Sequence, residues 1–158
     1  FASLTLGSGA AAMVMARSDR HKEVHKFVGG VTRAATQHNS LCVGSLDRMT
    51  TDTHGLLVAG LDLAADAWAD AADDFNWSQG LDWYIVHQVS KVHTTMLCDR
   101  LGINSAKVPL TFPQYGNVGP AAIPITLAKV QDQMKPGERV LCMGIGSGLN
   151  TSLTEILW

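Results

Sequence analysis

Three stretches of this 158-residue chain carry groups that could do chemistry, and the first is centred on His87. This histidine directly follows the apolar run 83–86 and precedes a run with helical spacing. A histidine at the carboxyl end of a buried strand lies where open α/β sheets bind their ligands. Its imidazole can donate or accept a proton near neutral pH. Taken alone, however, a single histidine is more often a structural residue.

The second and third stretches add an amide and an approachable backbone. Asn117 lies in a glycine-flanked loop that runs into the start of a helix, and its side chain donates without titrating. Residues 144–150 form a glycine-rich turn after the apolar strand 140–143. Glycines in such a turn let a substrate come close to the backbone, because no Cβ is in the way. The turn lacks the Gly-x-Gly-x-x-Gly spacing of a dinucleotide site, and too little chain follows it for that site.

In this order and spacing, the three stretches resemble the C-terminal half of the thiolase superfamily. The branch is that of the 3-oxoacyl-acyl-carrier-protein synthase III enzymes. Residues 87–93 (His-Gln-Val-Ser-Lys-Val-His) and 144–150 (Gly-Ile-Gly-Ser-Gly-Leu-Asn) are most similar to one group within it. These are the thiolases that join two fatty acyl-CoA molecules head to head on the way to long-chain olefins and β-lactones. The resemblance runs over most of the chain.

The resemblance also implies a role for each site residue. A Claisen condensation needs a thiolate that accepts an acyl group, donors that hold the enolate, and an oxyanion hole. His87 and Asn117 match the two side-chain donors, whose nitrogens converge on the thioester carbonyl of the second substrate. The backbone N–H of Ser147 matches the oxyanion hole, and Gly146 and Gly148 allow the substrate to approach. No metal and no cofactor is implied, since acyl-CoA is the substrate.

The cysteine nucleophile that the family uses has no match among the three cysteines of this chain. Cys98 falls inside a predicted helix and Cys142 inside a predicted buried strand, so both are expected to be structural. Cys42 lies in a predicted loop, but no apolar strand precedes it and no helix follows it at once. We therefore expect the catalytic cysteine in the N-terminal half of the fold, outside this chain. An odd number of cysteines without close pairs also favours a reducing compartment, the cytoplasm.

The predicted fold class is α/β, a thiolase-like C-terminal βαβαβαββ half preceded by the last strands of the N-terminal half. Residues 1–50 are expected to hold those end strands and a connection, and residues 51–158 the C-terminal half. The elements expected in the second part are strands at 83–86, 108–112, 139–144 and 151–158 and helices starting at 52 or 53, 90 and 119. In the first part, a hairpin around 7–9 and a strand at 27–32 are expected, followed by an irregular stretch of twenty residues.

The long helix that begins near Asp52 shows two faces. Its apolar positions, predicted to be the buried face, are Leu57, Leu61, Ala64, Trp68 and Phe75. Its aspartates, predicted to be a solvated stripe and not a metal or acid site, are Asp62, Asp66, Asp70 and Asp74. His93, on the next helix, is not at a metal-binding spacing from His87 and is expected to be positional or solvent-facing. A single half-fold would leave the Leu57–Leu61–Trp68 face and the strand before His87 uncovered.

Composition excludes several classes of protein. The net charge is −2 and no basic run interleaves with aromatic residues, which argues against nucleic-acid binding. Hydrophobic residues make up 46% of the chain, as in a globular domain. The apolar run 56–72 is interrupted by aspartates, so no membrane span is expected. The first residue is Phe1, within an apolar pattern, which is typical of a fragment, a processed chain or part of a longer chain.

The function that the resemblance favours is the condensation of two fatty acyl-CoA thioesters to a 3-oxoacyl-CoA. Two alternatives stay open: a synthase III that starts fatty-acid or polyketide synthesis, and a non-catalytic subunit that supports a heteromeric thiolase. In the synthase III pattern the turn usually reads Phe-Gly-Gly-Gly-Phe, whereas residues 145–149 read Ile-Gly-Ser-Gly-Leu. The expected partners are a fatty acyl-CoA or acyl-carrier protein, the cysteine-bearing N-terminal half, and a second copy or related subunit in a homo- or heterodimer.

Overall fold

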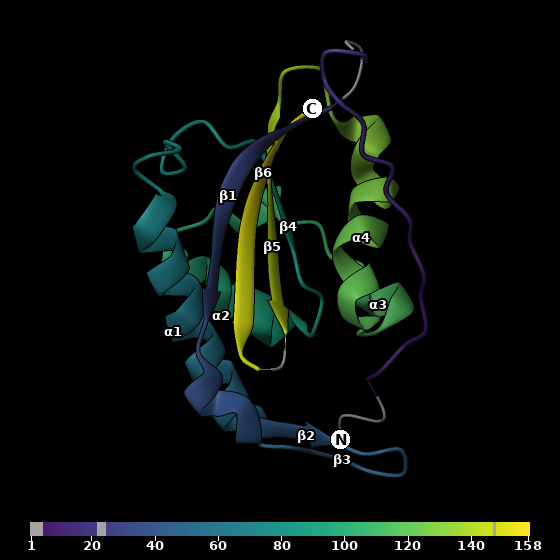
Figure 1. Cartoon of the computed structure of the whole chain (residues 1–158), viewed down its shortest axis with the longest axis vertical. Helices are drawn as coiled ribbons and strands as arrows, with labels where there is room; N and C mark the ends of the chain where they lie inside the picture. The colour runs from purple at the N-terminus through teal and green to yellow at the C-terminus, as the bar shows by residue number, and fades with distance from the viewer. Residues whose placement is uncertain (1–4, 22–24, 147) are drawn as a thin grey trace.

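A four-stranded sheet organises the computed structural model, which describes residues 5–21, 25–146 and 148–158. Its order is β1 (Lys26–Ala34), β6 (Asn150–Leu157), β5 (Arg139–Gly146) and β4 (Trp83–Val86). The edge strand β4 runs parallel to β5, while the other neighbours are antiparallel. Figure 1 shows helices on both sides of this sheet. The strands predicted at 83–86, 139–144 and 151–158 are confirmed, with slightly different ends for the last two.

Alternating residues of β4 and β5 serve two separate cores. Tyr84, Val86, Leu141 and Met143 pack in the core that α1 (Thr53–Ala71) and α2 (Lys91–Leu101) cover. Ile85, Val140 and Cys142 point the other way, into the core formed with α4 (Ala122–Val130). Both faces of these strands are therefore buried, which explains their continuous apolar sequence.

The helix ends follow the sequence signals. The Asp52 carboxylate accepts a hydrogen bond from the Gly55 N–H at 2.9 Å and caps α1. Ser90 caps α2 through its hydroxyl, and Gly102 ends that helix in the left-handed region, with φ of 66°. The helix predicted from residue 119 begins as the short 3-10 helix η4 (Gly119–Ala121) and continues as α4, so Pro124 falls in the first turn of α4.

The segment at residues 108–112 is not a strand, and that prediction was wrong. The chain forms the 3-10 helix η3 (Ser105–Lys107), then an irregular stretch, then the single-turn helix α3 (Phe112–Tyr115). The N–H groups of Thr111 and Phe112 donate to the side chain of Gln88, so they are not available for a neighbouring strand. The sheet consequently ends at β4.

The hairpin predicted around residues 7–9 is also absent from the part of the segment that the structure describes. Residues 5–16 run as one exposed length beside α4 and reach the loop at Asn117 (Figure 1). Leu6 and Asn117 form a parallel bridge, where Asn117 N–H donates to the Thr5 carbonyl and Gly7 N–H to the Asn117 carbonyl. A Cβ on Gly7 would lie 1.9 Å from the Tyr115 carbonyl oxygen, so the glycine is needed for close passage and not for a hairpin turn.

Residues 26–51 are more regular than expected. The strand predicted at 27–32 is confirmed as β1, and the following stretch contains the 3-10 helix η2 (Thr36–Leu41) and a small hairpin of β2 (Cys42–Gly44) and β3 (Met49–Thr51). β1 pairs along its length with β6, so the sheet extends across the boundary expected at residue 50. The division of the chain into parts of a larger fold stays a prediction.

The uncovered apolar surface differs from the expected one. β4 is buried, and the centre of the buried face of α1 consists of Gly60, Leu63, Ala64, Ala67 and Ala71. Leu57, Leu61 and Trp68 lie at its margin and are half-buried, while the aspartate stripe is exposed as predicted. The large exposed apolar side chains cluster instead at residues 13–15 and on the β2–β3 hairpin. Among the described residues, no helix is long and apolar enough to cross a membrane.

Candidate active site

His87 lies just past the carboxyl end of β4 and is half-buried. Its backbone N–H donates to the Met143 carbonyl at 2.9 Å. This bond continues the β4–β5 ladder by one residue and fixes the backbone position from which the side chain projects. Burial lowers the pKa of His87 from its ordinary value of 6.5, and the charge of His93 lowers it further. The imidazole is therefore neutral at pH 7 and can donate one hydrogen bond.

Of the two interpretations of His93, the structure favours the positional residue over the solvent-facing one. It is half-buried on the first turn of α2, and its Nδ1 lies 2.8 Å from the Ser90 hydroxyl oxygen. Burial lowers its own pKa as well. His93 is also close enough to His87 for its charge to lower the pKa of His87. The spacing of six residues does not predict this, because a strand end and a helix start lie between the two histidines.

Asn117 is held firmly by its backbone and by one end of its side chain. The N-terminal segment bonds both its N–H and its carbonyl, and its Oδ1 accepts from the Gly119 N–H at 3.0 Å. This leaves its Nδ2 without a hydrogen-bond acceptor among the described residues, as a free donor. Gly116, with φ of 69°, makes the turn into Asn117, and a Cβ there would lie 2.7 Å from the Thr5 carbonyl oxygen.

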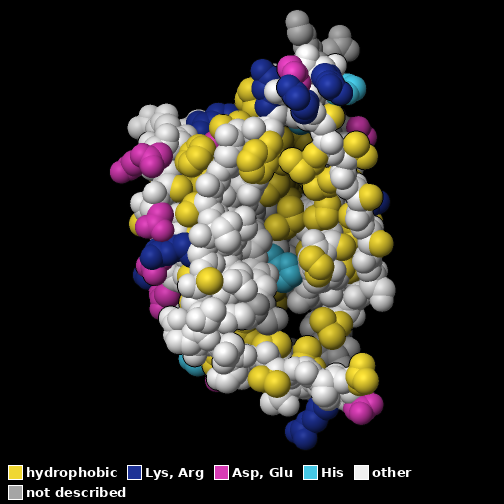
Figure 2. Space-filling model, viewed as in Figure 1, with side chains coloured by type: hydrophobic (Ala, Val, Ile, Leu, Met, Phe, Trp, Pro, Cys, Tyr) yellow, Lys and Arg dark blue, Asp and Glu magenta, His cyan; other side chains and the backbone are white. Residues whose placement is uncertain are grey.

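The three stretches meet at one end of the sheet. Because β4 and β5 are parallel and Val86 pairs with Met143, His87 lies beside Gly144, at the base of the glycine-rich turn. The first turn of α4, which follows Asn117, reaches the same place, since Ile123 Cδ1 would be 3.2 Å from a Cβ on Gly144. Figure 2 shows apolar side chains gathered in the hollow between the strands and α4.

The glycines of the turn differ in what they require. A Cβ on Gly146 would meet no atom of the described chain within 4 Å, so this position is open. Gly148 has φ of 138°, and a Cβ there would lie 2.4 Å from Asn150 Nδ2. Leu149 anchors the turn by exchanging two backbone hydrogen bonds with Ala35. Ser147, the expected oxyanion-hole residue, lies outside the described residues.

Two of the three cysteines, Cys98 and Cys142, have the buried environments expected of structural residues. Burial raises the pKa of Cys142 to about 12, and burial with the nearby Asp99 also raises that of Cys98. The raised pKa values lower the thiolate fraction of both thiols at neutral pH. Cys42 begins β2, is half-buried, and its Sγ lies 3.6 Å from the Thr51 hydroxyl oxygen. It is in a hairpin and not at the start of a helix.

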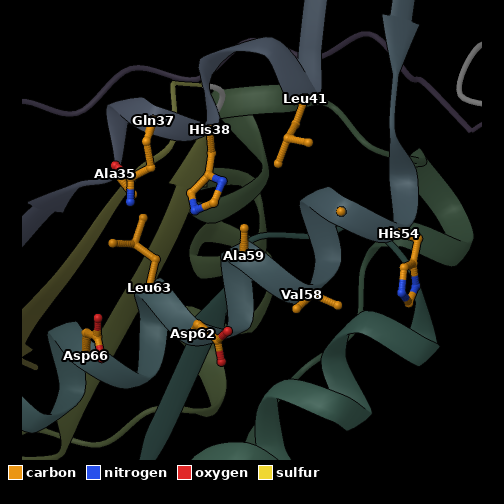
Figure 3. A pocket seen from close by; sticks show the side chains of 11 residues that line it. Ala35, Gln37, His38, Leu41, His54, Val58, Ala59, Asp62, Leu63 and Asp66 are labelled. Atoms are coloured by element: carbon orange, nitrogen blue, oxygen red, sulfur yellow. The ribbon is translucent and has the colours of Figure 1, made fainter.

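A separate hollow of about 510 Å³ lies between η2 and the first half of α1 (Figure 3). His38, His54, Asp62 and Asp66 line it together with apolar side chains. It contains none of the predicted site residues. The described residues include no group of three or more His, Cys, Asp or Glu side chains placed to hold a metal ion.

Comparison with known proteins identifies the family. The model of the 3-oxoacyl-[acyl-carrier-protein] synthase III C-terminal domain matches residues 76–158. The chain belongs to this family. The matched residues include His87, Asn117 and the glycine-rich turn.

Longer relatives in the synthase III family match the chain over its whole length. An acyl-CoA:acyl-CoA alkyltransferase from Xanthomonas campestris pv. campestris is 48% identical over 99% of this chain and 47% of the relative. A crystal structure of a Xanthomonas campestris OleA variant with bound lauric acid and lauroyl-CoA superposes with a TM-score of 0.95, at 48% identity, over 99% of this chain and 48% of that one. A 3-oxoacyl-(acyl carrier protein) synthase III from Xanthomonas oryzae gives a TM-score of 0.94 at 47% identity, over 99% of this chain and 47% of that one.

These matches confirm the predicted fold class, the C-terminal half of a thiolase-like α/β fold, and make the chain a homologue of thiolase-family acyltransferases. The chain spans about half the length of these relatives. Sequence reasoning missed Gln88 and the segment 5–7 as parts of the site. Gln88 carries no signal beyond its position next to His87, and the segment is far from Asn117 in sequence.

Proposed function

We propose that this chain forms the C-terminal half of an acyltransferase that condenses two fatty acyl-CoA thioesters to a 3-oxoacyl-CoA and free CoA. One observation carries the proposal: a neutral His87 and the free Asn117 amide belong to elements that meet at the same sheet end, beside the open Gly146. The similarity to the acyl-CoA:acyl-CoA alkyltransferase over 99% of the chain supports the choice of substrates.

In the proposed reaction, His87 and Asn117 act on the second acyl-CoA. Each donates a hydrogen bond to its thioester carbonyl oxygen, which becomes negatively charged when a general base other than these two residues takes the α-proton. The α-carbon then attacks the acyl group of the first substrate, carried as a thioester on a cysteine, and the cysteine thiolate leaves when the tetrahedral intermediate collapses. The backbone N–H of Ser147 donates to the oxygen of that tetrahedral intermediate. Both side chains are uncharged donors, so neither has to change its protonation state when the enolate forms.

We place the cysteine outside residues 1–158, in the N-terminal half of the fold. The raised pKa values of Cys98 and Cys142 and the hairpin position of Cys42 support this placement. A non-catalytic role for the chain is less consistent with its sequence, because His87, Asn117 and the glycine-rich turn are all retained.

A second candidate is the initiating synthase III reaction, with malonyl-carrier protein as the second substrate. The similarity to the Xanthomonas oryzae synthase III favours it. The turn sequence Ile-Gly-Ser-Gly-Leu at 145–149, in place of Phe-Gly-Gly-Gly-Phe, favours the acyl-CoA reaction instead.

The product formed from lauroyl-CoA separates the two candidates. The complete enzyme, with this chain and the cysteine-bearing half, should convert lauroyl-CoA alone into a 3-oxoacyl-CoA that carries both chains, as detected by mass spectrometry. His87→Ala should lower this rate by about 10²–10³-fold, the usual cost of one oxyanion donor. A product that forms only after malonyl-carrier protein is added would contradict the proposal and support the second candidate.

A further inference from the structure

Gln88, the residue after His87, is the most completely bonded buried side chain near the candidate site. It is 1% exposed. Its Nε2 donates to the Val86 carbonyl at 3.1 Å and the Pro109 carbonyl at 3.2 Å. Its Oε1 accepts from the N–H of Thr111 at 3.0 Å and of Phe112 at 3.2 Å. Both hydrogens and both lone pairs of the amide are therefore used.

These bonds join the end of the strand before His87 to the segment that leads to Asn117. Val86 is the last residue of β4, and Phe112 is the first residue of the single-turn helix α3. The Gly116 N–H donates back to the Phe112 carbonyl at 2.8 Å, so the position of Phe112 sets where α3 ends. Asn117 follows directly. Only a short, hydrogen-bonded path separates the Gln88 amide from the Asn117 donor.

A second buried contact fixes the same loop to α4. The hydroxyl oxygens of Thr111 and Thr126 lie 2.6 Å apart, and both side chains are buried. The loop is thus held from β4 by Gln88 and from α4 by Thr126. In the described sheet, no strand lies next to the loop. The Gln88 side chain therefore provides the hydrogen bonds that a neighbouring strand would otherwise give to the backbone of the loop.

We propose that Gln88 is a positioning residue for the condensation step: it fixes the Asn117 amide relative to the His87 imidazole. The proposal rests on the donor roles given above to His87 and Asn117. An amide is required because the site offers two carbonyls and two N–H groups to one side chain. A carboxylate would face the two carbonyl oxygens with negative charge, and an apolar side chain would leave all of these buried groups unpaired.

The test separates the two steps of the reaction in the complete enzyme. Gln88→Glu keeps the acceptor oxygen but loses both donated bonds, so the loop should shift and the two donors should lose their alignment. A displacement of about 1 Å costs about 10²-fold in rate, and this loss is expected in condensation of lauroyl-CoA. The first step, acylation of the cysteine by lauroyl-CoA, should keep its wild-type rate. Rapid quenching and mass spectrometry measure this rate. Gln133→Glu, the same change at an exposed residue of η5 (Gln131–Gln133), should leave both steps unchanged.

A second variant covers the case in which Gln88→Glu does not fold. The double substitution Thr111→Val with Thr126→Val removes the hydroxyl pair together and leaves neither partner unpaired. It should lower condensation by several-fold and again spare acylation. Equal losses in both steps, or wild-type condensation in both variants, would overturn the positioning role.

His87→Ala in the same assay distinguishes this failure from failure of the proposed function. If His87→Ala abolishes condensation while the Gln88 and Thr111/Thr126 variants do not, only the positioning role is wrong. If His87→Ala condenses at the wild-type rate, the donor assignment fails, and the positioning role fails with it.

Discussion

At the scale of single residues, the candidate site works with groups that are kept neutral. Burial and His93 together lower the pKa of His87, and Asn117 has no charge to lose. A neutral donor suits a substrate that binds uncharged and becomes negative only in the transition state, because the interaction strengthens as the reaction proceeds. His93 affects His87 through its charge, which lowers the pKa of the His87 imidazole.

The titration of His87 tests this coupling directly. The imidazole should titrate below 6.5 in the folded enzyme, and His93→Gln should move its pKa upward, because the like charge that opposes protonation is removed. The measurement is an NMR titration of the histidine ring protons, assigned with His87→Ala. An unchanged or lower pKa in the His93 variant would contradict the coupling.

The same two lowered pKa values predict how stability depends on pH. Below pH 6.5 the unfolded chain takes up protons that folded His87 and His93 do not bind. The free energy of unfolding should therefore fall as the pH decreases from 6.5 toward the folded-state pKa values. Substituting either histidine with glutamine should weaken this dependence in urea unfolding of the complete enzyme.

Two substitutions of Asn117 separate its turn role from its donor role. Asn117→Asp keeps the oxygen that accepts from the Gly119 N–H, but it replaces the Nδ2 donor with a negatively charged oxygen. Asn117→Ala loses both groups without adding charge. If the donor matters most, condensation of lauroyl-CoA should fall further in Asn117→Asp than in Asn117→Ala. The opposite ranking would make Asn117 a turn residue.

At the scale of elements, the sequence predicted those whose local signals agree with their surroundings. The apolar run 83–86 and the Ser90 and Gly102 caps of α2 each specify one structure, and the glycine turn marks the end of β5. The segments at 5–16 and 108–112 were predicted wrongly because distant residues decide their conformation. Gln88 takes the N–H groups of Thr111 and Phe112, and the Asn117 loop takes the backbone bonds of residues 5–7.

The candidate site, like the fold, was predictable only where local sequence signals decide the structure. The placement of His87 at a strand end follows from polarity alone, because the switch from apolar to polar residues marks where the strand ends. Its partnership with Asn117 required family resemblance, since no pattern in one sequence shows that a loop thirty residues later returns to the same sheet end. The role of His93 could not be read from its spacing.

An ion pair between the half-buried Arg139 and the buried Glu155 holds the loop after α1 to the sheet. Arg139 bonds both carboxylate oxygens of Glu155, at 2.7 and 2.9 Å, and Trp77 Nε1 donates to the same carboxylate at 2.8 Å. Burial raises the pKa of Glu155, but the hydrogen bonds from Arg139 and Trp77 outweigh it and hold the pKa below its ordinary value. Arg139 also donates to the carbonyls of Phe75 and Gln79 in that loop.

Removing the cation should therefore be costly. Arg139→Leu leaves the buried Glu155 carboxylate without a cation, with only the Trp77 hydrogen bond, and should lower the free energy of unfolding by about 3–5 kcal/mol. Arg100→Leu is the matched control, because its pair with Asp62 is exposed and should contribute less than about 1 kcal/mol. Urea unfolding of the complete enzyme measures both. Equal effects of the two substitutions would mean that the Arg139–Glu155 pair does not hold the loop.

At the scale of the whole molecule, the chain spans about half the length of its relatives and exposes apolar side chains at residues 13–15 as well as on the β2–β3 hairpin. Met13, Val14 and Met15 are 63%, 98% and 78% exposed, on an extended segment beside α4. An exposed apolar segment of this kind is typical of a surface that another part of a protein covers. This agrees with the proposal that an N-terminal half, with the cysteine, completes the fold over the α4 side.

The most direct test of the account is the site of acyl transfer. With radiolabelled lauroyl-CoA, the complete enzyme should carry the label as a thioester on a cysteine outside residues 1–158. Cys42→Ser should change neither the extent nor the rate of labelling, and residues 1–158 expressed alone should take up none. Peptide mapping by mass spectrometry identifies the labelled cysteine. Stable labelling of Cys42 would contradict the account, because it would place the nucleophile in this chain. It would also place it in a hairpin that contains none of the donors of the candidate site.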